Sequence, residues 1–296
     1  AFGNPDKYLK YFKNLGNARL AKDWGPYEID FLKAEALKSE QNKFDIAASL
    51  QKETETVIKN LLDPYVKKYN PKNICLSGGV SLNCVMTGKM LEWYPDIEIF
   101  CDPVPHDAGL TLGSCRYVWH QLLNNPRVYN NPRNHSPYLG KIYDKKDVLS
   151  SINKVLDKIE YKEVNDDYVV NLLTENDNVI SLFGGGSESG RRALGNRSIV
   201  ADPRSPNMKD IINKKVKHRQ WFRPFAPSIL EEETKNWFTH DVKSPYMSFA
   251  IPFKQEKLSQ VPAVVHNDGT ARLQTVSERD NKWYHSFIKK FQTKTG

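Results

Sequence analysis

The stretch Asn73-Ile-Cys-Leu-Ser-Gly-Gly-Val-Ser-Leu-Asn83 decides the fold class of this chain. Its first four residues form a short β-like run. The glycines at positions 78 and 79 end that run, and a helical pattern resumes over residues 82–93. A strand that ends in glycines and leads directly into a helix is typical of an α/β layer.

The flanking segments continue this alternation. Residues 44–69 repeat apolar side chains at steps of three and four, which predicts a long amphipathic helix before the strand. A second strand is predicted at 97–100, and a helix from about 108 to 122 follows a proline-rich turn. The order helix, strand, helix, strand, helix predicts an α/β domain.

A change of composition between residues 124 and 137, to Asn, Pro, Arg and Ser, predicts an exposed connection. We therefore expect a first domain at 1–125, a linker at 126–139 and a second domain at 140–296 that is incomplete at its C-terminal end. The second domain is predicted to be α/β or α+β. Its expected helices are 146–159, 166–174 and 281–291, and its expected strands are 179–183, 199–201, 247–251 and 272–276.

Bulk properties narrow the class of protein. With 296 residues, 39% of them hydrophobic, the chain is long enough to bury two cores. No apolar run reaches the roughly 20 residues of a membrane helix, and no signal peptide is recognisable, so we expect a cytoplasmic protein without a membrane partner. The four cysteines lack zinc-site spacing. The net charge of +8 permits nucleic-acid binding, but its spread along the chain fits phosphorylated small molecules equally well.

Two segments of the first domain have the residues of a ligand site. Gly78 and Gly79 allow a phosphate or ribose to approach the backbone at a helix N-terminus, although a simple strand-to-helix turn explains them too. Asp107 follows the predicted strand at 97–100 and is a good ligand for a hard divalent metal. The alternative is that Asp107 only caps the next helix.

The segment GGGSESGRRALGNRSIVADP at 184–203 combines a glycine loop with arginines. Backbone N–H groups and guanidinium groups there suit phosphate or carboxylate oxygens. The loop is not a Walker motif, because Arg191 and Arg192 stand where Lys and Ser/Thr are required. The alternative is a polar loop in which Arg192, Asn196 and Arg197 satisfy each other and nearby carbonyl groups.

Two further segments are rich in cations. KHRQWFRPFAPS at 217–228 interleaves basic and aromatic residues before a rigid proline-containing stretch, a pattern that fits an anion pocket or an RNA-binding surface. HNDGTARLQ at 266–274 contains a turn signal at Asp268-Gly269. The side chains of His266, Arg272 and Gln274 around that turn make the segment a candidate for binding.

Taken in order, these segments resemble the O-carbamoyltransferase family of nodulation-factor, cephamycin and tobramycin biosynthesis. The matching stretches are LSGGVSLN at 76–83, PxxxDAG at 103–109, RRALGNRSIVADPR at 191–204, KHRQWFRPFAPSIL at 217–230 and PAVVHNDGTARLQTV at 262–276.

The resemblance implies a partial actin-like (sugar-kinase-type) ATPase domain followed by an α/β domain like the threonylcarbamoyl-adenylate synthases. It implies that carbamoyl phosphate is activated with ATP to carbamoyl adenylate and that the carbamoyl group passes to a hydroxyl of a small-molecule acceptor. The implied site residues are Arg192, Lys217, Arg219 and Arg223 for catalysis, Gly78, Gly79 and Asn83 for the nucleotide, Asn196, Arg197, Ser198, His266 and Arg272 for carbamoyl phosphate or its adenylate, and Asp107 for a divalent metal, iron or magnesium.

The chain also departs from the family pattern. The family's His-x-x-x-His pair of an N-terminal lobe and its Asn-Thr-Ser-Phe-Asn segment near the C-terminus are missing, which predicts a fragment. Gly184, Gly186, Ser189 and Arg191 replace the residues that are usual in the glycine loop. Two alternatives therefore stay open: a tRNA-modification-related or RNA-binding protein, and an inactive nucleotide-binding remnant. The sequence does not identify the acceptor, the metal or the oligomeric state.

Overall fold

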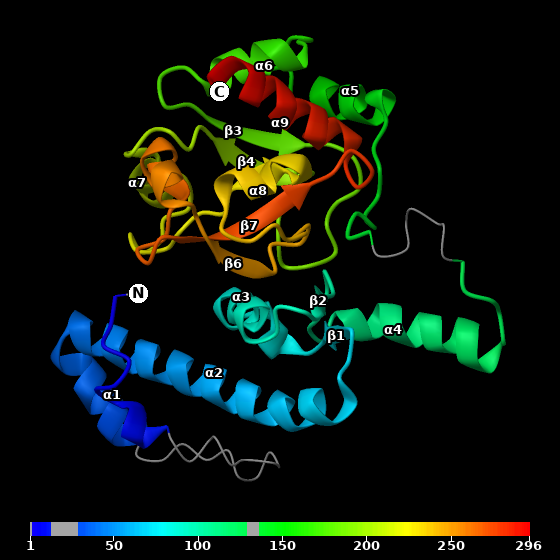
Figure 1. The fold of residues 1–296 in the computed structure, drawn as a ribbon. Helices are drawn as coiled ribbons and strands as arrows, with labels where there is room; N and C mark the ends of the chain where they lie inside the picture. Colours follow the sequence, from blue (N-terminus) through cyan, green and yellow to red (C-terminus); the bar gives the residue numbers. More distant parts are fainter. Residues whose placement is uncertain (1, 13–28, 129–135) are drawn as a thin grey trace. The chain divides into compact units, whose positions relative to one another are not determined.

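The computed structural model describes residues 2–12, 29–128 and 136–296 (Figure 1). Its contacts divide the chain into two compact units. The first comprises Ala1–Ile74 and Lys89–Ile99, and the second comprises Cys75–Gly88 and Phe100–Gly296. The linker expected at 126–139 stays a prediction, and its residues 129–135 lie outside the described residues.

Helix α2, Glu40–Tyr69, is the long central helix of the first unit. It begins four residues before the predicted start because Ser39 caps it, its side chain accepting a hydrogen bond from the Asn42 backbone at 3.0 Å. It ends at Asn70, whose left-handed conformation (φ 42°) closes the last turn. The apolar periodicity thus predicted the helix, and the cap determined where it begins.

Ion pairs and hydrogen bonds hold neighbouring segments to α2. Helix α1, Ile29–Lys38, packs against it. Lys89 Nζ lies 2.5 Å from Glu55 Oε2, and the Tyr94 hydroxyl donates to Asp63 Oδ1 at 2.7 Å. These contacts tie residues 89–94 to α2.

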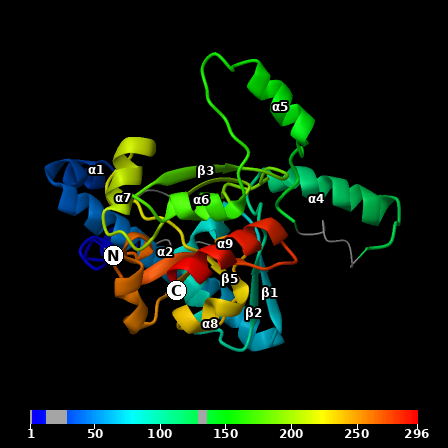
Figure 2. The same ribbon diagram turned by 90° about the horizontal axis from the view of Figure 1, so that it is seen from above.

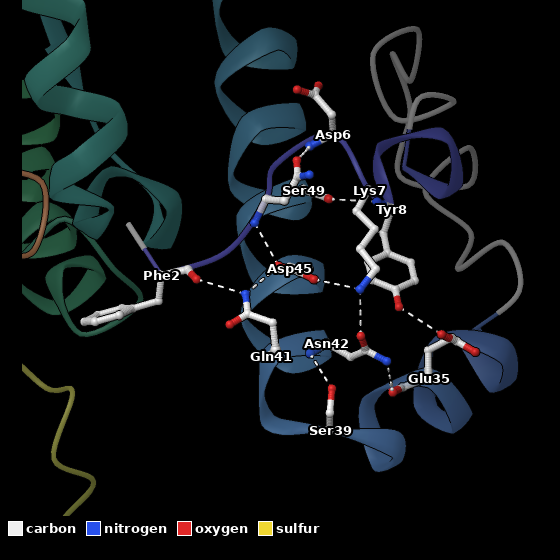
Figure 3. Close-up of polar contacts among 11 residues, drawn as sticks. Phe2, Asp6, Lys7, Tyr8, Glu35, Ser39, Gln41, Asn42, Asp45 and Ser49 are labelled. Atoms are coloured by element: carbon white, nitrogen blue, oxygen red, sulfur yellow. Dashed lines mark hydrogen bonds and ion pairs between the residues drawn. The ribbon is translucent and has the colours of Figure 1, made fainter.

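The buried carboxylate of Asp45, on α2, binds the N-terminal segment (Figure 3). It accepts hydrogen bonds from the Asn4 backbone, Lys7 Nζ and Gln41 Nε2, each at 2.8 Å. The bond from Lys7, followed by those from Asn4 and Gln41, lowers the pKa of Asp45 to about 2. The segment that includes the 3-10 helix Leu9–Tyr11 is therefore held by a carboxylate that stays ionised.

The glycine-containing stretch that opened the sequence analysis has the expected strand and helix. Strand β1, Asn73–Leu76, pairs with β2, Glu98–Cys101. A 3-10 turn, Gly79–Leu82, precedes α3, Cys84–Trp93, so the α-helix starts two residues later than predicted. The predicted helix at 108–122 is α4, Gly109–Tyr117, continued by a π-helical turn, Val118–Leu122.

A two-stranded antiparallel sheet of the second unit shares a hydrophobic core with two helices. Strand β3, Val179–Phe183, pairs with β4, Arg197–Ala201. Helices α6, Asp166–Leu173, and α9, Lys282–Thr295, lie side by side in both ribbon views (Figures 1 and 2). Their buried core contains Val170, Leu173, Leu182, Val276, Tyr284 and Phe287.

A three-stranded sheet completes the second unit. Strand β7, Thr270–Val276, is central, with β5, Ser228–Leu230, parallel to it on one side and β6, Phe249–Pro252, antiparallel on the other. The remaining elements are α5 Lys145–Asn153, α7 Met208–Ile211, a π-helical turn Ile212–Val216, α8 Thr234–Trp237 and the 3-10 helices Glu231–Glu233, Gln255–Gln260 and Pro262–Val264.

The mixed α/β class is confirmed. Helix α5 ends six residues before its predicted end at 159, and strand β5 was not predicted at all. No helix in the described part of the chain combines the length and apolar character needed to cross a bilayer.

Candidate active site

All five segments singled out in the sequence lie entirely in the second unit. They are residues 76–83, 103–109, 191–204, 217–230 and 262–276. A cavity of about 600 Å³ lies in the same unit and is lined by residues of the last three segments. Seven basic residues line it: Arg191, Arg192, Lys209, Lys217, Arg219, Arg223 and Arg272. The four residues predicted for catalysis therefore share one cavity.

The acidic residue in the cavity wall is already neutralised. Asp202 is buried, and its carboxylate accepts from Arg204 Nε at 3.0 and 3.1 Å and from Arg204 Nη2 at 2.6 Å. Arg204 is not among the residues that line the cavity. Asp202 is consequently a poor counter-charge for the seven cations.

These cations have no anionic partner among the described residues. In the parts of the chain that the structure describes, no carboxylate lies within 4.0 Å of any of the seven. Arg191, Lys217 and Arg223 are exposed and the other four are partly buried. Seven like charges around one cavity create a strong positive potential, which favours a bound anion.

Arg272 is the clearest case of a cation without a partner among the described residues. Its Nε is buried and has no hydrogen-bond partner among the described residues. Burial, and next the charge of Arg192, lower the pKa of the Arg272 guanidinium to about 10. A phosphate or carboxylate oxygen in the cavity would supply both the missing acceptor and the missing charge.

Arg219 is held by its own segment of chain. Its Nε donates to Asn213 Oδ1 at 2.7 Å, and its guanidinium lies 4.6 Å from the centre of the Phe225 ring. Burial, and next the charge of Arg223, lower the pKa of Arg219. Asn213 carries no signal that distinguishes it in the sequence, and its part in this contact was not predicted.

A buried hydrogen-bond chain forms another wall of the cavity. The Tyr284 hydroxyl donates to Ser228 Oγ at 3.0 Å, and Ser228 Oγ donates to Gln274 Oε1 at 2.8 Å. Gln274 Nε2 then donates to the Leu194 carbonyl at 3.0 Å. This chain fixes Gln274, which the sequence had suggested, and adds Ser228 and Tyr284, which it had not.

The predicted nucleotide residues lie beside an arginine of the cavity. Arg192 Nη2 donates to the carbonyl of Leu82, one residue before Asn83, at 3.3 Å. Asn83 Oδ1 accepts from the Met86 backbone at 3.2 Å. Gly78 has a φ of +95°, and a Cβ added at Gly78 or Gly79 would meet nothing within 4 Å. Open space beside both glycines is compatible with a ligand at the backbone.

His266 is oriented by its neighbours in the turn. The Thr270 hydroxyl donates to Asp268 Oδ1 at 2.7 Å and lies 3.0 Å from His266 Nδ1. Because that hydroxyl gives its proton to the carboxylate, Nδ1 carries the imidazole proton and Nε2 is a bare acceptor. Nε2 is buried without a partner among the described residues, and burial lowers the pKa of His266. His266 does not line the cavity itself.

Two residues predicted to bind the carbamoyl donor, Asn196 and Arg197, instead donate hydrogen bonds to carbonyl groups of the glycine loop. Asn196 Nδ2 donates to the Gly186 carbonyl at 2.8 Å, and Arg197 Nη1 donates to the Gly184 carbonyl at 2.6 Å. Neither lines the cavity, whereas Ser198 does. The polar-loop alternative therefore accounts for Asn196 and Arg197, and the cavity offers no support for their predicted contact with the carbamoyl donor.

The predicted metal ligand is not part of a cluster of metal-binding side chains in the described residues. Asp107 is exposed, and nowhere in residues 2–12, 29–128 and 136–296 do three His, Cys, Asp or Glu side chains gather to hold an ion. One carboxylate does not fill the coordination shell of iron or magnesium. The described residues do not form a metal site, and no step of the chemistry below is assigned to a metal.

Comparison with known proteins identifies the family. Residues 5–116 match the model of the carbamoyltransferase N-terminus, and residues 171–296 match that of the carbamoyltransferase C-terminus. The chain belongs to the carbamoyltransferase family. Three of the segments that line or flank the cavity, at 191–204, 217–230 and 262–276, lie within the C-terminal match.

Curated relatives show the same membership. The chain is 35% identical to nodulation protein NolO of Bradyrhizobium diazoefficiens in an alignment that covers 99% of the chain and 56% of NolO. It is 37% identical to nodulation protein NolNO of Sinorhizobium fredii, covering 87% and 38%, and 35% identical to an uncharacterised protein of Synechocystis, covering 86% and 45%. The chain thus spans about half the length of these relatives.

Proposed function

We propose that this carbamoyltransferase chain takes part in ATP-dependent O-carbamoylation. Carbamoyl phosphate is activated to carbamoyl adenylate in the cationic cavity, and the carbamoyl group then passes to a hydroxyl of a small-molecule acceptor. The observation that carries the proposal is the set of seven basic side chains around one cavity without an anionic partner.

The charge of the cavity suits the donors. Carbamoyl phosphate and ATP both bring phosphoryl oxygens, and unneutralised guanidinium groups are the side chains that bind such oxygens with two parallel hydrogen bonds. Arg219 and Arg223 come from the same segment, while Arg192 and Arg272 come from others. Arginines from different segments of the chain can therefore bind different phosphoryl groups of one ligand.

The proposed chemistry balances without an external oxidant or reductant. Water cleaves carbamoyl phosphate to carbamate and phosphate. A carbamate oxygen attacks the α-phosphorus of ATP, the bond to the β-phosphate oxygen breaks, and pyrophosphate leaves. The acceptor hydroxyl then attacks the carbamoyl carbon and displaces AMP. Negative charge builds on the phosphoryl oxygens in the second step, where fixed cations lower the barrier.

The finer features of the fold belong to this proposal. An actin-like first domain would bind the adenylate near Gly78, Gly79 and Asn83, and a second domain like the threonylcarbamoyl-adenylate synthases would form it. In support, the Arg192 guanidinium contacts the Leu82 carbonyl within that glycine-containing segment. Arg192 thereby connects the two groups of predicted ligands.

The test is pyrophosphate release from ATP in the presence of carbamoyl phosphate and a divalent cation. We expect release by the 296-residue chain, with a loss of about 100-fold or more in Arg219→Ala and Arg223→Ala. Arg279→Ala is the matched control, because Arg279 is exposed and does not line the cavity. ATP binding without any release would instead favour the inactive nucleotide-binding remnant.

A further inference from the structure

Asn213 is the most completely buried amide near the arginine-bearing segment 217–223. Its side chain has 0% exposure and lies in the π-helical turn Ile212–Val216. Oδ1 accepts from Arg219 Nε at 2.7 Å. Nδ2 donates to the carbonyls of Trp221 at 3.3 Å and Arg223 at 3.0 Å. One side chain therefore contacts three residues of the segment.

The backbone reinforces this arrangement. The Asn213 carbonyl accepts from the Arg219 backbone N–H at 3.1 Å, and the Lys217 N–H donates to the Ile212 carbonyl at 2.8 Å. Between them, His218 has a φ of 47°, in the left-handed region that non-glycine residues adopt uncommonly and that His tolerates better than most. The two backbone bonds and this turn at His218 therefore define the path of the segment next to Asn213.

The chemistry of the amide matters as much as its position. An amide offers an acceptor for the Arg219 guanidinium and two donors for the carbonyl groups, and it carries no charge. An aspartate at this position would accept from Arg219 but would neutralise it and lose both donors. Asparagine thus orients the guanidinium and leaves its positive charge for a ligand.

We propose that Asn213 is a positioning residue of the anion-binding cavity. It fixes Arg219, and with it the backbone of Arg223, so that both guanidinium groups face the same phosphoryl oxygens. The identity of that anion rests on the proposed function, whereas the positioning of Arg219 does not.

The first experiment measures the positioning directly. Each arginine of the full chain is allowed to react with phenylglyoxal, and the modification rate is followed by peptide mass spectrometry. We expect Arg219 to react roughly 10-fold faster in Asn213→Ala than in the unmodified sequence, because one charge-assisted hydrogen bond has been lost. Asn213→Asp retains the acceptor and should leave Arg219 protected.

The second experiment measures the consequence for anions, with inorganic pyrophosphate as the probe. We expect roughly 10-fold weaker binding in Asn213→Ala and at least as large a loss in Asn213→Asp, where the carboxylate cancels the charge of Arg219. In the Arg219→Ala background, Asn213→Ala should weaken binding less than it does in the unmodified chain, because the part of its effect that is exerted through Arg219 is already lost and only the contact with the Arg223 carbonyl remains.

A control tests whether the loss of any asparagine side-chain bond has the same effect. Asn178→Ala removes an exposed bond in a different segment, from Nδ2 to the Leu172 carbonyl at 2.8 Å, and should change neither measurement. Asn213→Ser replaces Asn213→Ala if the alanine variant is unfolded at the assay temperature.

The outcomes are distinct. Equal modification of Arg219 in the unmodified chain and in a folded Asn213→Ala or Asn213→Ser variant overturns the positioning role, as do fully additive effects of Asn213→Ala and Arg219→Ala on binding. Protection of Arg219 by Asn213 in a folded chain that binds no pyrophosphate supports the positioning role and contradicts the proposed function.

Discussion

Ser228 and Gln274 stand opposite each other in the parallel strands β5 and β7, and the Ser228 hydroxyl donates to Gln274 Oε1 at 2.8 Å. The pair joins two segments that are 46 residues apart in the chain. It holds the three-residue strand β5, which leads out of the proline-containing wall of the cavity, against the centre of the sheet.

Gln274→Leu should destabilise the second unit. Gln274 is 2% exposed, and its replacement removes the acceptor of the Ser228 hydroxyl. It also removes one of two donors to the Leu194 carbonyl, which keeps its bond from the Tyr138 hydroxyl at 2.9 Å. We expect a loss of about 1–3 kcal/mol in the free energy of unfolding, measured by urea denaturation. The control Gln260→Leu removes an exposed bond to the Glu256 carbonyl and should cost less than about 0.5 kcal/mol. Equal effects of the two variants would contradict the role of the buried pair.

Arg272→Met should stabilise the free protein and weaken anion binding. The buried guanidinium now has an unpartnered Nε, and an apolar side chain of similar length removes that penalty. We expect a higher Tm in phosphate-free buffer, together with a loss of the additional stabilisation that pyrophosphate gives to the unmodified chain. A lower Tm without ligand would show that Arg272 has a structural partner.

Asp45 should make stability fall in acid. Its folded pKa of about 2 lies below the ordinary value of 3.8, so the ionised carboxylate stabilises the fold. That contribution is complete above pH 3.8 and is lost as the pH falls through 2. Asp45→Asn should flatten this part of the profile of unfolding free energy against pH, measured from pH 2 to 6. An unchanged slope would mean that the bonds to Asn4 and Lys7 do not persist in solution.

His266, like Asp45, should make the protein less stable as the pH is lowered, but at a higher pH than Asp45. Burial lowers its folded pKa below 6.5, so the neutral ring is the form that fits, and its contribution is complete above pH 6.5 and is lost below that value. His266→Gln should reduce the dependence of Tm on pH between 5 and 7. An unchanged dependence in His266→Gln would contradict this role of the buried ring.

Local patterns predicted the local structure well. The three- and four-residue periodicity identified α2, and the apolar run at 179–183 identified β3 with its bounds. Strand β5 was missed because three residues carry no periodic signal, and it is a strand only through its pairing with β7. The short α7 and the π-helical turn after it were missed for the same reason.

The sequence likewise predicted some residues of the site but not the contacts that depend on the fold. Arginine-rich segments indicated Arg192, Arg219, Arg223 and Arg272, which the fold brings to one cavity. The sequence could not show that Arg197 is occupied by carbonyl groups of the glycine loop, because that depends on how the loop closes. Nor could it show that Asn213, among many asparagines, is the buried one that contacts the arginine segment.

The most direct test of the central claim is the dissociation constant of ATP for the 296-residue chain, measured by isothermal titration calorimetry. The cationic cavity predicts saturable binding at one site, weakened roughly 10-fold or more by Arg223→Ala and unchanged by Arg279→Ala. Equal affinities for the unmodified chain and Arg223→Ala, or no binding by a folded chain, would contradict the assignment of this cavity to a phosphorylated donor.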